Sequence, residues 1–279
     1  ACTYAGGLAQ FYKSGSVIKR INAGKAAECG VIAALLTQEG IWGPRDILEG
    51  KEAGFFRVFS DQPNPSCVTD DLGRGYRLLE VSTKVHAGAG RLQATNDAGL
   101  ALGAGHQLTP EQIVDVEVGI PKVIQGMLTK NDPHDMQSAM LSVPFSLALA
   151  LALGRARGPA AGITPADYDN TLADPAVRAL AMRVRCVVDP VIEAKTTTEE
   201  VPSRVTIKLA DGRTLEASVD HPRGSPRRPL AWNEISALFG DTLAGALPDS
   251  SIRNIIDLVA GLDGKSSARD ITAAFVAAM

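Results

Sequence analysis

Basic and amide side chains gather in the segment 15–30, which is the part of this sequence best suited to binding an anion. Lys19, Arg20 and Asn22 come just before an expected helix that opens with the small residues of 23–27. The first backbone N–H groups of a helix have no partner within the helix and carry partial positive charge. We therefore expect an ordered turn here that collects positive charge and binds carboxylates.

Each of these three side chains also has an ordinary structural alternative. Lys19 could be a surface lysine near a helix start, although the helix dipole disfavours a cation there. Arg20 could hold a carboxylate through two parallel hydrogen bonds, or form a buried ion pair with Glu28, Asp46 or Glu49. Asn22 could bind a carboxylate, but capping the helix that follows is the simpler role.

A second group of candidates lies in the segment 84–93, at the end of an expected strand. Lys84 and Arg91 could hold the charge of a substrate, and His86 could move a proton near neutral pH. An ordinary, partly exposed loop histidine is an equally simple interpretation of His86. The backbone N–H groups of 87–90 could cradle an anion before a helix, although so short a glycine pattern is weak support.

These segments resemble the signature of the MmgE/PrpD family. The shared pattern is Gly-Ser-x-x-Lys-Arg-x-x-Ala-Gly-x-Ala-Ala at 15–27, followed by Gly-Pro at 43–44 and Leu-Glu-Gly at 48–50. The resemblance implies metal-independent dehydratases and decarboxylases of citrate-like acids, such as 2-methylcitrate dehydratase and cis-aconitate decarboxylase, and an iminodisuccinate epimerase. It also implies a homodimer with its active site between a helical domain and a lid.

The resemblance implies roles for single residues as well. Three are expected to be catalytic, Lys19, Lys84 and His86, and three to bind substrate, Arg20, Asn22 and Arg91. Asn22 stands where most members carry histidine, and an amide cannot transfer a proton near neutral pH. Gln93 and small residues lie near the places of the family's lid histidines. Gln125 occupies the place of a tyrosine implied for decarboxylase members, which argues against simple transfer of that activity.

Composition excludes several functional classes. The chain has 279 residues, of which 45% are hydrophobic and 21% charged, as expected of a folded core. A net charge of -3 and the lack of a long basic run argue against a nucleic-acid partner. The apolar run 141–153 is shorter than the roughly 20 residues that span a bilayer, so we expect a buried core helix and no membrane contact.

The cysteines and histidines predict no cofactor site. Cys2, Cys29, Cys67 and Cys186 lack the spacing of a metal site or a disulfide framework. We expect reduced thiols, with Cys29 on a buried helix face, and neither a metal nor another cofactor. No signal peptide is recognisable at the start of the sequence, which predicts a cytoplasmic protein.

Hydrophobic periodicity predicts a mixed α and β protein, with an all-helical domain formed by both chain ends and an inserted α+β lid domain. The expected parts are 1–77 of the helical domain, the lid at 78–227, and C-terminal helices at 228–279 that return to the helical domain. The N-terminal part is expected to be helical from about Thr3 to Ser60, and the lid to begin with a strand at 78–85. Other expected elements are a helix at 92–102, a strand at 114–120, a core helix at 138–153, helix starts at Pro165 and Pro175, a hairpin at 205–219, and helices at 233–239, 252–262 and 271–276.

Two further expectations concern the chain ends. The sequence starts with Ala1 rather than Met, and MmgE/PrpD proteins are considerably longer. We therefore expect a carboxyl-terminal portion that lacks most of a leading helical region and shows little activity alone. Its exposed apolar face is expected to promote association.

Overall fold

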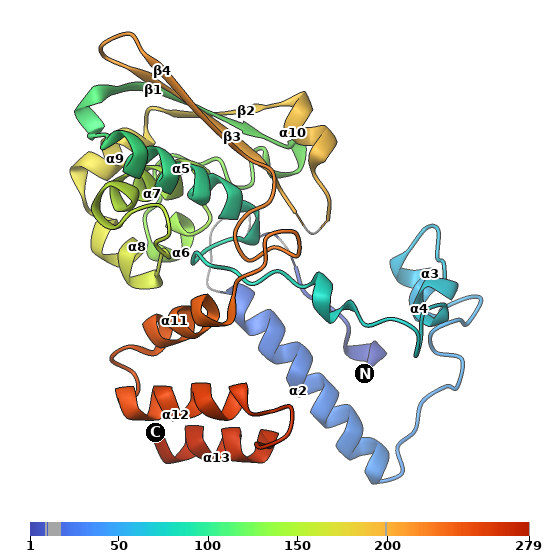
Figure 1. The fold of residues 1–279 in the computed structure, drawn as a ribbon. Coiled ribbons are helices and arrows are strands. Elements are labelled where there is room, and N and C mark those ends of the chain that lie inside the picture. The colour runs from blue at the N-terminus through green and yellow to red at the C-terminus, as the bar shows by residue number, and fades with distance from the viewer. Residues whose placement is uncertain (9, 11–17, 199, 279) are drawn as a thin grey trace. The chain divides into compact units, whose positions relative to one another are not determined.

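The computed structural model describes residues 1–8, 10, 18–198 and 200–278. The chain divides into two compact units, Ala1–Glu80 and Val81–Met279 (Figure 1). Both contain helices, and the second contains a four-stranded sheet. The mixed α and β class predicted from the sequence is therefore confirmed.

The first unit is built around one long helix, α2 (Ile18–Gln38), with Cys29 buried on it as predicted. Because α2 already begins at Ile18, residues 19–22 lie inside its first turns, and the predicted turn before a helix is wrong for them. Asn22 is consequently not the helix cap. Residues 15–17 of the predicted turn lie outside the described part of the chain.

Two other predictions, for the N-terminus and for the start of the lid, are wrong. Near the N-terminus the described residues form only the short 3-10 helix η1 (Cys2–Tyr4), because Gly6 and Gly7 follow it and disfavour a helix. The predicted strand at 78–85 is replaced by the 3-10 helix η2 (Arg77–Glu80) and an irregular segment. Leu78 and Leu79 are exposed there, so no buried face enforces the alternating pattern of a strand. The remaining helices are α3 (Phe55–Phe59) and α4 (Ser66–Thr69).

The sheet of the second unit has the strand order β2-β1-β3-β4. Strand β1 (Ile113–Ile120) pairs in parallel with β2 (Val184–Val188) and antiparallel with β3 (Ser203–Leu209), which pairs antiparallel with β4 (Thr214–Val219). Helix α5 (Gln93–His106) packs on β3 and β4, and α7 (Val143–Arg157) contacts β2. The predicted strand at 114–120, the hairpin and the helix at 92–102 are confirmed.

The hairpin turn differs from the type I′ turn that Asp211-Gly212 suggests. That turn needs positive φ at both central residues, but here only Gly212 has it, at 88°. Asp211 instead accepts a hydrogen bond on Oδ1 from the backbone N–H of Arg213 at 3.0 Å, and Gly212 N–H donates to Leu209 O at 3.0 Å. The side chain of Asp211 thus stabilises a longer loop, a known alternative for aspartate in turns.

The apolar run 141–153 forms most of α7, a core helix as predicted, and Phe145, Leu147 and Leu149 are fully buried in it. The helix starts later than expected because the hydroxyl of Ser142 accepts from Phe145 N–H at 3.0 Å and caps it. A separate short helix, α6 (Met136–Ala139), precedes it. Among the described helices, none is long and apolar enough to cross a membrane.

Short connections and three C-terminal helices complete the second unit. Helices α8 (Pro165–Thr171) and α9 (Pro175–Ala181) begin with proline, as predicted. The predicted C-terminal helices are also confirmed as α11 (Trp232–Leu243), α12 (Asp249–Ala260) and α13 (Ala268–Ala278). The other elements are η3 (Gly90–Leu92), η4 (Pro110–Gln112), η5 (Lys122–Ile124) and α10 (Pro190–Lys195). The return of the C-terminal helices to an N-terminal helical domain stays a prediction.

Helices α5 and α7 cross with their backbones in direct contact. A Cβ added to Gly103 of α5 would lie 2.1 Å from Leu151 O, and a Cβ added to Gly154 of α7 would lie 2.2 Å from Leu100 O. The glycine-rich segment 99–105 forms the last two turns of α5 and supplies this contact. At Gly103 and at Gly154, any side chain larger than a hydrogen atom would clash with the backbone of the partner helix unless the helices separate.

We predict that Gly103→Ala destabilises the protein by about 1–3 kcal/mol or more, because the helices must move apart and the core between them loosens. Gly105→Ala is the matched control, since it lies in the same helix with nothing within 4 Å of an added Cβ. That control is expected to be neutral or stabilising by up to about 1 kcal/mol through helix propensity. Urea unfolding followed by circular dichroism measures both, and equal effects of the two substitutions would contradict the packing argument.

Candidate functional site

A cavity of about 880 Å³ in the second unit brings together Lys84 and His86, two of the predicted site residues. Its wall is formed by the segment 84–87, by Arg157 and the segment 161–166, and by residues of α11 and its C-terminal end. This volume lies within the range of small-molecule sites. The cavity is therefore the candidate functional site of this unit.

Backbone hydrogen bonds hold the segment 83–87 in place. Thr83 N–H donates to Gly224 O at 2.8 Å, and Ala87 N–H donates to Ile163 O at 2.7 Å. His86 and Ile163 also form an isolated parallel bridge. The wall that carries Lys84 and His86 is thus fixed by two segments distant in the sequence.

His86 is buried beside Asp97, so its interpretation as a partly exposed loop histidine is wrong. Its side chain has no exposed surface, and Nε2 lies 3.0 Å from Asp97 Oδ1. Asp97 Oδ2 accepts the backbone N–H of Arg223 at 2.7 Å and lies 3.6 Å from Arg228 Nη1. Among the described residues, His86 Nδ1 has no hydrogen-bond partner.

These contacts set the charge state of Asp97. Burial by itself raises the pKa of its carboxyl, but the hydrogen bonds from His86 and from the Arg223 N–H, together with nearby positive charge, outweigh it. The net effect is a pKa below the ordinary value of 3.8. Asp97 is therefore an anion at neutral pH, and it lies beside the buried imidazole of His86 and the guanidinium of Arg228.

Gln93 clamps the same segment from the first turn of α5. Its Oε1 accepts from His86 N–H at 3.0 Å, and its Nε2 donates to His86 O at 2.9 Å. Ala89 N–H donates to Met140 O at 3.1 Å, and Ala87 N–H is bonded to Ile163 O. The N–H groups of Ala87 and Ala89 are therefore not available to the predicted anion cradle at 87–90.

The cationic lining residues differ in their pairing. Lys84 is exposed, and its Nζ donates to Gly88 O at 3.0 Å. Arg157 instead forms a two-pronged pair with the buried carboxylate of Asp167, which also accepts from Thr164 N–H at 2.8 Å. Burial raises the pKa of the Asp167 carboxyl, but the hydrogen bonds from Arg157 and Thr164 lower it by more. The net pKa is therefore below the ordinary value of 3.8. The charge of Arg157 is therefore largely compensated at this cavity.

The remaining predicted site residues are Arg91 of the second unit and three residues of the first unit. Arg91 is exposed and is not among the lining residues, and its Nη1 lies 3.7 Å from Met127 Sδ. Asn22 is half-buried on α2 in the first unit. The side chains of Lys19 and Arg20 lie outside the described part of the structure. The functional roles of all four stay predictions.

The described residues contain no group of three or more histidine, cysteine, aspartate or glutamate side chains that could hold a metal ion. His134, which lies close to Asp132 and Asp135 in the sequence, belongs to no such group.

Comparison with known proteins adds to this geometry. The sequence model of the MmgE/PrpD C-terminal domain matches residues 86–263, which include most of the cavity wall, and that of the MmgE/PrpD N-terminal domain matches residues 1–68. The chain belongs to the MmgE/PrpD family. The resemblance inferred from the motif at 15–27 is confirmed.

The chain is similar to several curated MmgE/PrpD relatives at modest identity. It is 25% identical to cis-aconitate decarboxylase of Aspergillus terreus, over 94% of this chain and 55% of that protein. It is 27% identical to 2-methylcitrate dehydratase of Cupriavidus necator, over 74% of this chain and 43% of that protein. The chain thus spans about half the length of these relatives.

Sequence reasoning missed the residues that organise this MmgE/PrpD cavity. Asp97 was not singled out, although it lies one turn after Gln93 on α5, in a run of three polar residues inside an otherwise apolar helix. That run was a usable signal, because a buried carboxylate needs a partner. Arg223 and Asp167 offered no such signal, since their partners lie 126 and 10 residues away and only the fold brings them together.

We predict that Asp97→Asn lowers the free energy of unfolding at neutral pH by roughly 3 kcal/mol, because it removes the buried anion that compensates the charges around it. The folded-state pKa of Asp97 is depressed, so its contribution is present above the unfolded value of about 4 and is lost as the pH falls through the folded value. The parent should therefore lose stability below about pH 4 more steeply than the variant.

Urea unfolding over a pH series measures this difference. The exposed Asp257 on α12 provides the control Asp257→Asn. If the parent and Asp97→Asn unfold at the same urea concentration at neutral pH, the carboxylate does not stabilise the cavity wall.

Proposed function

We propose that this protein is a lyase or isomerase that acts beside the carboxylates of a small polycarboxylate such as 2-methylcitrate, without a metal. The supporting observation is the cavity of about 880 Å³ that lies mostly within the matched MmgE/PrpD C-terminal domain and carries Lys84 and His86 on one wall. The dehydratase and decarboxylase relatives support a lyase of this family. A hydro-lyase reaction is the more specific proposal.

The proposed chemistry sets requirements for the residues. Removing water from a hydroxy acid needs a base for the proton beside a carboxylate, an acid for the leaving hydroxyl, and cations for the charge that develops. Lys84 is proposed to bind a substrate carboxylate, because its ammonium group is an exposed cation at the cavity. Lys19, Arg20 and Arg91 are proposed to supply further positive charge.

His86 is the proposed proton carrier. Its Nε2 lies 3.0 Å from Asp97 Oδ1, and a carboxylate in this position orients the imidazole, as it does for catalytic histidines in general. Because the His86 side chain is fully buried, this role requires the segment 84–87 to move when substrate binds. Asn22 is proposed to bind substrate by hydrogen bonds, since an amide cannot exchange a proton there.

The assembly and location of the protein stay predictions. A homodimer, a cytoplasmic location and low activity of the 279 residues alone are the outcomes expected from the family resemblance and the sequence.

We predict that Lys84→Ala lowers kcat/KM about 100-fold or more, by analogy with the loss of one group that stabilises developing charge. The protein expressed from the complete open reading frame is incubated with 2-methylcitrate, citrate, cis-aconitate or iminodisuccinate, and the products are followed by NMR. Lys19→Ala is compared in the same assay. Lys208→Ala, an exposed lysine on β3, is the matched control and should leave turnover unchanged. Turnover by Lys84→Ala at the parent rate would contradict the proposed role of Lys84.

A non-catalytic polycarboxylate-binding subunit is the second candidate. Asn22 in the place of the family histidine favours it, and so does the pairing of Arg157 with Asp167 at the cavity. Calorimetry separates the two candidates: tight binding of a polycarboxylate without turnover would support the binding subunit and overturn the lyase.

A further inference from the structure

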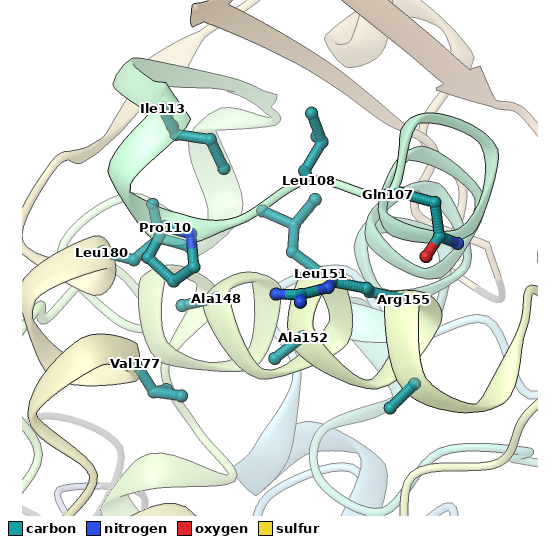
Figure 2. Close-up of a pocket in the computed structure, with 11 residues that line it drawn as sticks. Gln107, Leu108, Pro110, Ile113, Ala148, Leu151, Ala152, Arg155, Val177 and Leu180 are labelled. Carbon is teal, nitrogen blue, oxygen red and sulfur yellow. The ribbon is translucent and has the colours of Figure 1, made fainter.

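A second pocket of about 310 Å³ lies on α7, with walls from the chain after α5 and from α9 (Figure 2). Its apolar surface includes Ala148 and Leu151 of α7, Leu180 of α9, and Ile113 at the start of β1. All four of these side chains are almost fully buried and belong to the hydrophobic core, whereas the apolar lining that remains accessible comes from Pro110, Ala152 and Ala156. The pocket therefore lies directly over the hydrophobic core of the second unit.

Arg155 is the charged residue that lines this pocket. Figure 2 shows its side chain lying across the pocket, with the guanidinium toward Pro110. Arg155 is exposed, and no hydrogen bond or ion pair joins it to another side chain in the described part of the chain. A guanidinium presents five N–H donors in a planar fork that matches a carboxylate.

The charge of Arg155 acts on the carboxylate of Glu111 in η4, but the two side chains form no ion pair in the described part of the chain. The pKa of Glu111 is lowered mainly by hydrogen bonds from its own backbone and from Thr109, and less by the charges of Arg155 and Arg183. Glu111 is exposed to solvent, so its charge is screened. The guanidinium at the pocket thus remains open to a ligand anion.

We propose that this pocket binds a small unbranched monocarboxylic acid, with its carboxylate on Arg155 and its acyl chain on the apolar floor. An apolar floor with one cation at its margin complements a molecule that has one charged end and one apolar end. A second carboxylate would have to leave water for the apolar floor without a partner, which is unfavourable. The pocket therefore selects against the polycarboxylates proposed for the larger cavity.

The small volume also limits the ligand. A pocket of about 310 Å³ is at the lower end of the range for small-molecule sites, so a short acyl chain suits it and a long one does not. The two sites share no lining residue, because the larger cavity uses Arg157 and the segments at 84–87 and 161–166. The inference therefore does not depend on the proposed function.

Binding of hexanoate to the full chain, measured by calorimetry and by saturation-transfer NMR, tests the proposal. Hexanamide is the matched ligand without the charge. We expect saturable hexanoate binding, and about tenfold weaker binding of hexanamide, because a hydrogen bond to a charged group is lost. Arg155→Gln should weaken hexanoate binding about tenfold, whereas Arg253→Gln on the exposed side of α12 should not change it.

Ala152→Phe adds a second, independent test, because Ala152 lines the pocket and a larger side chain there fills it. Circular dichroism checks that each variant folds, and if Ala152→Phe does not, the comparison of Arg155→Gln with Arg253→Gln decides alone. Three results would overturn the proposal: no saturable binding of hexanoate, equal binding of hexanamide and hexanoate, or hexanoate binding that Arg155→Gln leaves unchanged.

Discussion

The direct backbone contact between α5 and α7 is the constraint on which the second unit depends. With Gly103 and Gly154 facing the partner helix, the two helices approach closely enough to form one layer against the sheet. This layer carries both sites, because Asp97 on α5 contacts His86 of the larger cavity, Arg157 on α7 lines that cavity, and the smaller pocket lies on α7 itself. A change in the distance between the helices would therefore alter both sites together.

Local signals in the sequence predicted most of the elements of the second unit. Pro165 and Pro175 mark helix starts because proline suits the first turn, and the alternation at 205–219 marks a hairpin because one face is buried. The strand predicted at 78–85 failed because alternation alone cannot supply a partner strand. The turn predicted at 19–22 was wrong because nothing in those residues disfavours a helix. The start of α2 was predicted too late in the sequence.

The candidate site was predictable only in part. Lys84 and His86 were predicted because a lysine can bind an anion and a histidine can transfer a proton near neutral pH. The structure brings both to one cavity. Of their supports, Asp97 was predictable from the polar run 95–97 in α5, whereas the partners of Arg223 and Asp167 are supplied only by the fold. The same is true of the pocket at Arg155, whose apolar wall comes from three separated segments.

The bond between the Asp97 carboxylate and the Arg223 backbone has a consequence for the order in which this unit forms. It joins residues separated by 126 positions, so the chain must close a long loop before the bond stabilises anything. The β3–β4 hairpin needs only local closure and can form early. We therefore expect the contact between Asp97 and Arg223 to form after the hairpin, and to be an early point of local opening in the native protein.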